Sequence, residues 1–277
     1  MLQVGFGVGD ITPKVGMDIP GGFYPHPSKG VLDPLSASAC VVYDGTTPVA
    51  LVGLDAIAIE KSLVTRARAA IAAATKIPAA NVLIGCNHTH EGGPTLAVAY
   101  EVDNAEYLDT VAKGITDAVT SAWNSLHAAE IGVGTGRQEG IAFNRRFLMR
   151  DGREITHPGK PGTPHHADIV RIAGPVDPDV GVLAARGPDG SILGVVVHFG
   201  CHGTVVGGSQ YSPDFSGYLR KHLKSRYGDA TPVVFLLGPC GDVTQVDNQA
   251  TSRDFGPDHA DMMGRLLAGE TIRTIER

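Results

Sequence analysis

Two histidine-rich segments have the residue types and spacing of a metal site. Residues 87–90 read Asn-His-Thr-His and residues 198–202 read His-Phe-Gly-Cys-His, and each segment follows an apolar run. In an extended backbone, side chains two residues apart project from the same face. His88 and His90 would then share one face, as would His198 and His202. Imidazoles offered in pairs are common metal ligands, so the pattern predicts a metal site, with hydrogen-bonded structural histidines as the alternative.

Three aspartates stand at the ends of other expected strands. Asp55 ends an apolar run, Asp214 follows Ser-Pro, and Asp242 follows Pro-Cys-Gly. A carboxylate in such a place binds a metal ion or orients a ligand histidine. For Asp214 the capping of a helix N-terminus is an equal alternative, because a helix is expected to begin there.

Composition limits the classes of function. A chain of 277 residues that is 43% hydrophobic can form one large α/β domain or two small ones. Its net charge of −6 argues against nucleic acid as a partner. No run approaches the roughly eighteen apolar residues of a membrane span. The N-terminus lacks a signal-peptide pattern, so we expect a cytoplasmic protein, or a secreted one whose leader has been removed.

The elements that must position these residues follow from apolar periodicity. Strands are expected at 3–9, 38–43, 48–55, 81–86, 131–133, 180–185, 192–199 and 232–237, and helices at 60–75, 106–127, 215–227 and 257–275. Residues 140–168 show little periodicity and predict a long surface excursion. Two of the strand pairs are hairpins. The pattern therefore predicts an α/β fold of mixed β-sheets layered with outer helices, in a single large domain over residues 1–277.

The order of short motifs resembles the N-terminal catalytic region of the neutral/alkaline non-lysosomal ceramidase family, which includes bacterial relatives of undefined substrate. The matching segments extend through nearly the whole sequence: 8–13, 33–35, 52–55, 88–90, 144–145, 176–180, 201–204, 212–214, 217–218 and 241–243. Each motif is short, but the ordered set is specific.

The resemblance implies that His88 and His202 are zinc ligands and that His90 and Arg145 face the substrate. It implies metal-assisted hydrolysis of a small-molecule or N-acyl substrate, with Arg145 stabilising the oxyanion. Thr244 stands where the family has the serine of a Gly-Asp-Val-Ser motif.

In the family, the remaining zinc ligands, a glutamate and a tyrosine, and an immunoglobulin-like domain lie beyond the region that this sequence matches. Four residues of this chain are therefore local candidates to complete the site: Asp55, Asp214, His90 and His198.

Three functions remain open from the sequence. The first is a zinc-dependent hydrolase of amide or ester bonds. The second is a domain that binds a metal ion or ligand without turnover and retains the fold. The third is a hydrolase with Thr244 or Ser212 as nucleophile, together with Asp242 and a histidine. It is disfavoured because the sequence lacks a Gly-x-Ser-x-Gly nucleophile elbow.

Overall fold

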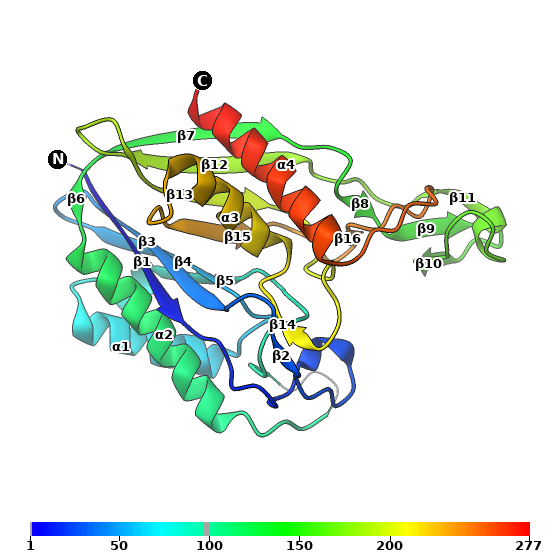
Figure 1. Ribbon diagram of the computed structural model, residues 1–277, viewed down its shortest axis with the longest axis horizontal. Helices are drawn as coiled ribbons and strands as arrows, with labels where there is room; N and C mark the ends of the chain where they lie inside the picture. Colours follow the sequence, from blue (N-terminus) through cyan, green and yellow to red (C-terminus); the bar gives the residue numbers. More distant parts are fainter. Residues whose placement is uncertain (1, 97–99) are drawn as a thin grey trace.

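Two β-sheets pack face to face, and each is covered on its outer face by a pair of helices (Figure 1). The computed structural model describes residues 2–96 and 100–277. The first sheet has the order β5-β4-β3-β1-β6, formed by Val82–Cys86, Pro48–Leu54, Ser36–Tyr43, Gln3–Asp10 and His127–Ala128. The second has the order β15-β13-β12-β7, formed by Val233–Leu237, Ile192–Phe199, Asp179–Arg186 and Glu130–Arg137.

Both sheets are built on the same plan. In the first, β1, β3 and β4 pair antiparallel, and α1 (Lys61–Ala74) crosses over to β5, which pairs parallel to β4. In the second, β7, β12 and β13 pair antiparallel, and α3 (Phe215–Tyr227) crosses over to β15, which pairs parallel to β13. A closing helix follows each parallel strand: α2 (Ala105–Asn124) and α4 (Pro257–Ile275). The sequence shows no repeat, yet the topology repeats.

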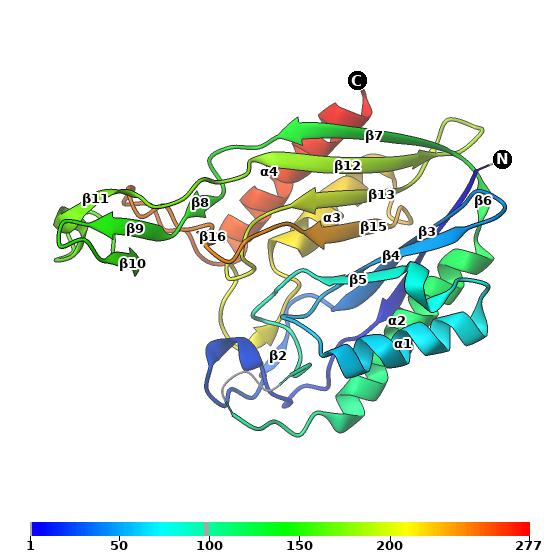
Figure 2. The same cartoon turned by 180° about the vertical axis from the view of Figure 1, so that it is seen from behind.

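Three hydrophobic clusters hold the four layers together. One lies between the first sheet and α1 and α2, and another between the second sheet and α3 and α4. The third lies between the two sheets and includes Phe6, Cys40, Val196 and Val234. Strands that are buried on both faces are expected to be continuously apolar. The Val-Val-Val run inside β13 has this character because alternate residues face different clusters. Figure 2 shows α3 and α4 behind the second sheet.

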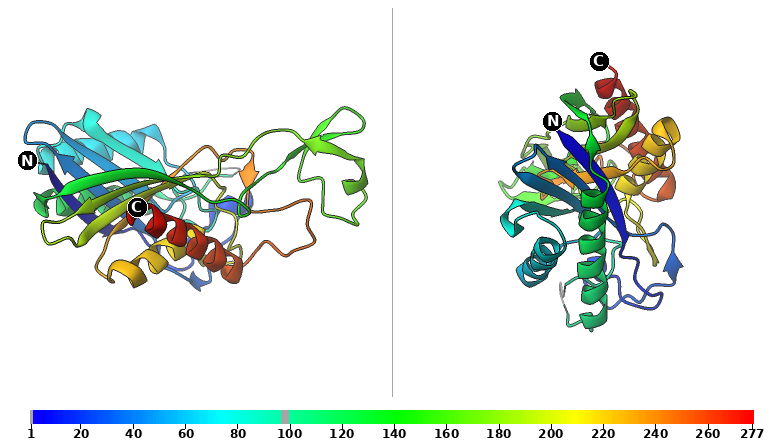
Figure 3. Two further views of the ribbon diagram at one scale, coloured as in Figure 1. Left: turned by 90° about the horizontal axis from the view of Figure 1, so that it is seen from above. Right: turned by 90° about the vertical axis from the view of Figure 1, so that its left-hand side faces the viewer.

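A three-stranded sheet projects from one end of the sandwich (Figure 3). It consists of β9 (Arg146–Met149), β10 (Glu154–Thr156) and β11 (Ile169–Ile172). The expected surface excursion at 140–168 is therefore an ordered arm. Its base is the pairing of β8 (Phe143–Asn144) with β16 (Val243–Thr244). Short segments complete the chain: η1 (Pro20–Gly22), η2 (Ala79–Asn81), η3 (His166–Asp168), and β2 (Gly30–Val31) paired with β14 (Gln210–Tyr211).

The predicted fold class is confirmed. The chain is one α/β domain with mixed sheets and outer helices, and α3 and α4 have the predicted bounds. Among the helices of the described residues, none has the length and apolarity to cross a bilayer.

Candidate metal centre

The segment after β5 turns sharply and brings His88 and His90 to the same side. Asn87 is buried, and its amide donates hydrogen bonds to Asp55 Oδ1 and Ser216 Oγ, both at 2.9 Å. Its own oxygen accepts from the backbone N–H of Thr89. His88 takes a left-handed conformation with φ of 61°, which is costly for a residue other than glycine. The predicted extended geometry is therefore wrong at this residue, and a turn positions the two rings.

His202 reaches the same place from the second sheet. It lies beyond the end of β13, and its backbone N–H donates to Val243 O at 3.0 Å. The two histidine segments run side by side, since Thr89 and Gly203 form a parallel bridge and His90 N–H donates to Gly203 O at 2.9 Å. A Cβ at Gly203 would lie 2.7 Å from His88 O, so only glycine permits this close approach.

The three imidazoles form one cluster. The ring centroids of His88 and His202 are 4.4 Å apart, and that of His90 is 5.2 Å from each. The Nε2 atoms of His88 and His202 are 3.1 Å apart. One nitrogen from each ring lies within 4.8 Å of the others, and this is the group of potential metal ligands found among the described residues. His202 is buried and the other two are half-buried.

Backbone carbonyls fix the orientation of all three rings. Each Nδ1 lies within hydrogen-bond distance of a carbonyl oxygen: His88 of Ile57 at 2.7 Å, His90 of Gly21 at 2.9 Å, and His202 of Cys240 at 3.1 Å. A carbonyl can only accept, so Nδ1 donates and Nε2 keeps its lone pair in the neutral ring. This is the arrangement that orients metal-binding histidines in proteins.

The electrostatics of the cluster fit a cation. Two Nε2 lone pairs that face one another at 3.1 Å repel unless a proton or a metal ion lies between them. His90 Nε2 is buried and has no hydrogen-bond partner among the described residues. Burial lowers the pKa of His90 and of His202 to about 4, and the nearby positive charge of Arg145 adds to this effect. Both rings are therefore neutral at pH 7, which is the form that binds a metal ion.

Arg145 lies close to the cluster, because it contacts Gly241, the residue after Cys240, whose carbonyl contacts the ring of His202. It is half-buried, and its Nη2 donates to Gly241 O at 2.5 Å. Asp242 holds this segment in place, because its Oδ2 accepts from Asn144 Nδ2 at 2.8 Å and its backbone carbonyl accepts from Arg145 N–H. Asp242 therefore positions Arg145 and is not part of the histidine cluster.

The other two aspartates predicted as supporting residues are occupied by protein partners. Asp55 is buried and forms a bidentate ion pair with Arg220 of α3, with N–O distances of 2.9 and 2.8 Å. It also accepts hydrogen bonds from Ser36 and Asn87. Asp214 accepts three backbone N–H groups, including that of Phe215, the first residue of α3. Burial raises the pKa of Asp214 to about 6, although these hydrogen bonds lower it. Asp55 supports the turn at Asn87, and Asp214 caps α3.

The structure does not bring His198 or Thr244 into the cluster. β13 ends at Phe199, so the alternation of side chains that would align His198 with His202 does not continue. His198 is exposed and lies opposite Gly181 and Leu236 in the sheet. Thr244 is buried, and its hydroxyl donates to Gln245 Oε1 at 2.7 Å.

The described residues do not form the arrangement that a hydrolase with a hydroxyl nucleophile would need. Ser212 is fully buried and its Oγ accepts from Asp214 N–H. Among the described residues, no histidine ring contacts Asp242, Ser212 or Thr244 through a hydrogen bond.

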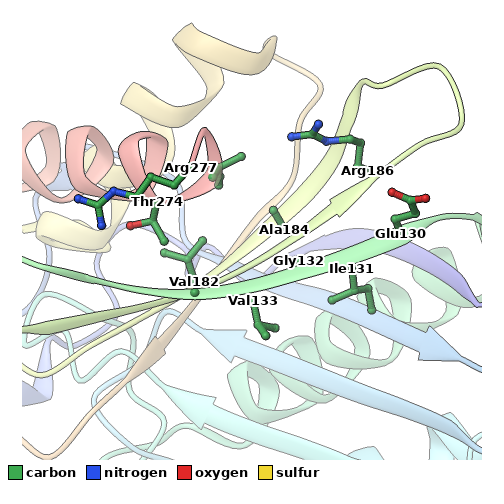
Figure 4. Close-up of a pocket in the computed structure, with 11 residues that line it drawn as sticks. Glu130, Ile131, Gly132, Val133, Val182, Ala184, Arg186, Thr274 and Arg277 are labelled. Carbon is green, nitrogen blue, oxygen red and sulfur yellow. The ribbon is translucent and has the colours of Figure 1, made fainter.

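Sequence analysis missed one buried acid beside the cluster. Glu91 is only 8% exposed, and burial, with the charge of Asp214, raises its pKa to about 7. It lines a cavity of about 200 Å³ together with His90. The sequence feature that could have identified Glu91 is a charged residue inside a glycine-rich bend, directly after His-x-His. A separate cavity of about 320 Å³ lies at the opposite end of the sandwich, lined by β7, β12 and the end of α4 (Figure 4).

Comparisons with known proteins agree with the fold. The structure is similar to a neutral ceramidase from Pseudomonas aeruginosa and to a ceramidase solved in complex with C2, each with a TM-score of 0.78 and 19% sequence identity. The fold is that of neutral ceramidases. Both similarities cover all of this chain, but the chain spans only 45% and 44% of theirs, consistent with an N-terminal ceramidase-like region. No family model and no curated protein matches the sequence.

Proposed function

We propose that this chain is a zinc-dependent hydrolase domain that cleaves an amide or ester bond, with an N-acyl compound as the substrate class. The observation that carries the proposal is the convergence of three imidazoles, each fixed through Nδ1 by a backbone carbonyl. The ceramidase-like fold supports a hydrolase.

His88, His202 and His90 would hold the metal ion through Nε2. Three protein ligands are usual for catalytic zinc, and three histidines are one of the known sets. The resemblance of the motifs assigned His90 to the substrate side, whereas its unpartnered Nε2 and its place in the cluster favour a third ligand. A bound zinc ion supplies Lewis acidity, which polarises a carbonyl oxygen and acidifies water.

Arg145 would stabilise the negative charge that develops on the scissile carbonyl oxygen. Its guanidinium donates to Gly241 O through one nitrogen, which leaves other N–H groups to donate. Donors that are already in place where charge develops make a large contribution to catalysis. Asn144 and Asp242 keep Arg145 in position through the pairing of β8 with β16. Thr244 is too enclosed to attack a substrate, so its role in this proposal is structural.

The test combines metal analysis with a panel of N-acyl amides and esters. The protein is loaded with zinc, dialysed and assayed for metal content and for hydrolysis, together with the variants His88→Ala and His202→Ala. His127→Ala serves as the control because His127 is exposed on β6, away from the cluster.

The expected result is one zinc ion per chain and hydrolysis of at least one substrate, with both properties lost in the two cluster variants and kept in the control. Zinc binding without any hydrolysis would favour the alternative of a non-catalytic metal-binding domain. A protein that stays free of metal after reconstitution would exclude the proposal.

A further inference from the structure

Two segments that are far apart in the sequence form the walls of the cavity next to His90. The segment 19–26 forms one wall and residues near Gly208 form another. His26 joins them, because its Nε2 donates to Gly208 O at 2.9 Å, and its carbonyl accepts from Ile19 N–H at the same distance. A Cβ at Gly21 would lie 2.6 Å from His90 Cα, so the backbone of this wall is in close contact with His90.

Glu91 gives this cavity a buried acid whose side chain finds no partner in residues 2–96 and 100–277. Its main chain is held on both sides, since its N–H donates to Thr89 Oγ1 at 3.2 Å and its carbonyl accepts from Ser212 N–H at 3.0 Å. Its Oε2 is buried and has no hydrogen-bond partner among the described residues. None of the ion pairs recorded among the described residues includes Glu91. An unpaired buried carboxylate is costly, so its retention points to a partner that arrives with a ligand.

The surroundings of Glu91 favour a positively charged partner. Asp214, whose charge acts on Glu91, already accepts three backbone N–H groups, whereas the side chain of Glu91 accepts none that the structure records. A hydroxyl group offers Glu91 one hydrogen-bond donor, whereas an ammonium group offers several N–H donors together with a positive charge. Thr204 also lines the cavity, and its hydroxyl donates to Gln245 Oε1, which leaves its lone pairs to accept from a second N–H.

Two aromatic residues lie on this wall: Tyr24 lines the cavity, and Phe23 lies between Tyr24 and Gly22, which also lines it. Phe23 is 62% exposed and Tyr24 is 60% exposed, which is unusual for such large apolar surfaces. The Phe23 ring lies edge-on to His90 with centroids 6.3 Å apart, and Tyr24 packs edge-on to His26 at 5.8 Å. Phe23 holds a left-handed φ of 64°, a strained conformation of the kind that gathers at ligand sites. Exposed aromatic faces attract cations and cover the alkyl carbons next to them.

We propose that this cavity makes the enzyme selective for substrates that carry a primary ammonium group within a few bonds of the scissile amide or ester, and that Glu91 is the specificity-determining residue. The inference rests on the proposed function, because the cavity shares His90 with the metal centre. A primary ammonium is compact enough for a cavity of about 200 Å³ and has three N–H donors for Glu91 and Thr204.

The experiment uses matched amides that differ only in a terminal ammonium, hydroxyl or methyl group three carbons from the scissile bond. One series carries the group on the acyl side and the other on the amine side. Wild type is compared with Glu91→Gln and with Glu130→Gln, a matched control because Glu130 is exposed and lines the cavity at the opposite end of the sandwich. Zinc content and thermal unfolding verify that each variant is folded. Binding of n-butylammonium and n-butanol is measured separately by titration calorimetry.

In at least one series, wild type should prefer the ammonium substrate to the methyl substrate in kcat/KM. Glu91→Gln should lower kcat/KM for the ammonium substrate by about 30-fold, as for loss of one partner of a buried charge pair, and should change the methyl substrate less than twofold. Wild type should bind n-butylammonium and not n-butanol, and Glu91→Gln should bind neither. Glu130→Gln should match wild type throughout.

Hydrolysis that ignores the terminal group, or an ammonium preference that survives in folded Glu91→Gln, would overturn the inference and leave the proposed function intact. If no amide or ester is cleaved but n-butylammonium still binds through Glu91, the proposed function fails and the ammonium cavity remains.

Discussion

The two halves of the sandwich share one topology but contribute differently to the metal centre. In the first half, the proposed ligands His88 and His90 follow β5, the strand after the crossover helix. In the second half, the proposed ligand His202 follows β13, the strand before the crossover helix. The three histidines therefore come from strand ends that are not topologically equivalent, even though all of these strand ends meet at the same end of the sandwich.

The remaining two strand ends hold the ligands in place. After β4 comes Asp55, which pairs with Arg220 of the other half and supports the turn at Asn87. After β15 comes Cys240, whose carbonyl accepts from the ring of His202. Each half thus supplies one ligand segment and one supporting segment. The site can form only when the halves dock, because Arg220 and Gly203 must reach across to the first half.

The largest expected effect separates the two histidines of the segment 198–202. His202→Ala should weaken zinc binding by about 1,000-fold, equivalent to about 4 kcal/mol, because one of three nitrogen ligands is lost. His198→Ala should change zinc affinity less than twofold, because His198 is exposed in the sheet outside the cluster. Competition with a chromogenic chelator measures both. Equal losses would mean that His198 and not only His202 reaches the metal ion.

The next effect tests the ion pair between Asp55 and Arg220, which links the two halves of the sandwich. Arg220→Met leaves the buried carboxylate of Asp55 without its cation and should lower the free energy of unfolding by about 3 kcal/mol. Asp55 keeps hydrogen bonds from Ser36 and Asn87, which limits the loss. Urea denaturation of the metal-free protein is the measurement. In the double variant Asp55→Leu/Arg220→Met the loss should be smaller, because no unpaired charge is left.

An exposed pair provides the control for that experiment. Lys113 and Asp117 form an ion pair on the surface of α2, and Asp117→Ala should change the free energy of unfolding by less than about 1 kcal/mol. A loss for Arg220→Met no larger than this would show that the ion pair does not hold the halves together.

The fold could be predicted from sequence to a large extent because its layers depend on local patterns. The Val-Val-Val run of β13 and the amphipathic spacing in α2 each indicate an element without knowledge of the rest. The arm was expected as a surface excursion, but its strands were missed because they are short and because prolines and glycines crowd residues 158–164.

The site was predicted less completely because long-range contacts decide its geometry. Resemblance of motifs indicated His88 and His202, and the structure brings them together. The left-handed turn at His88 depends on Asn87 and its bond to Asp55, 32 residues earlier in the chain. The place of Glu91 in a cavity depends on walls from residues near 20 and 208. No spacing rule within one segment contains this information.

A smaller effect tests the contact between the ligand segments. Gly203→Ala would place a Cβ 2.7 Å from His88 O, so the two segments must separate. We expect a loss of about 2 kcal/mol in the free energy of unfolding, as for overpacking of a tight contact, and a measurable loss of zinc affinity. Gly132→Ala on β7 is the control, because a Cβ there meets no atom within 4 Å. Unchanged zinc affinity in Gly203→Ala would show that the bridge does not position the ligands.

The smallest effect is the pH dependence that the cluster gives to the metal-free protein. Burial lowers the pKa of His202 to about 4 from an ordinary value of 6.5, so between these values the unfolded chain binds more protons than the folded one. The contribution of this ring to stability is present above pH 6.5 and is lost as the pH falls through 4. The raised pKa values of Glu91 and Asp214 change the stability in the opposite direction as the pH falls. Measurements on wild type alone therefore do not isolate the contribution of His202. In the presence of a chelator, urea midpoints between pH 7 and pH 4.5 should therefore fall more for wild type than for His202→Asn. Parallel curves would mean that the ring of His202 is solvated in the metal-free protein and that the second half does not bury its ligand.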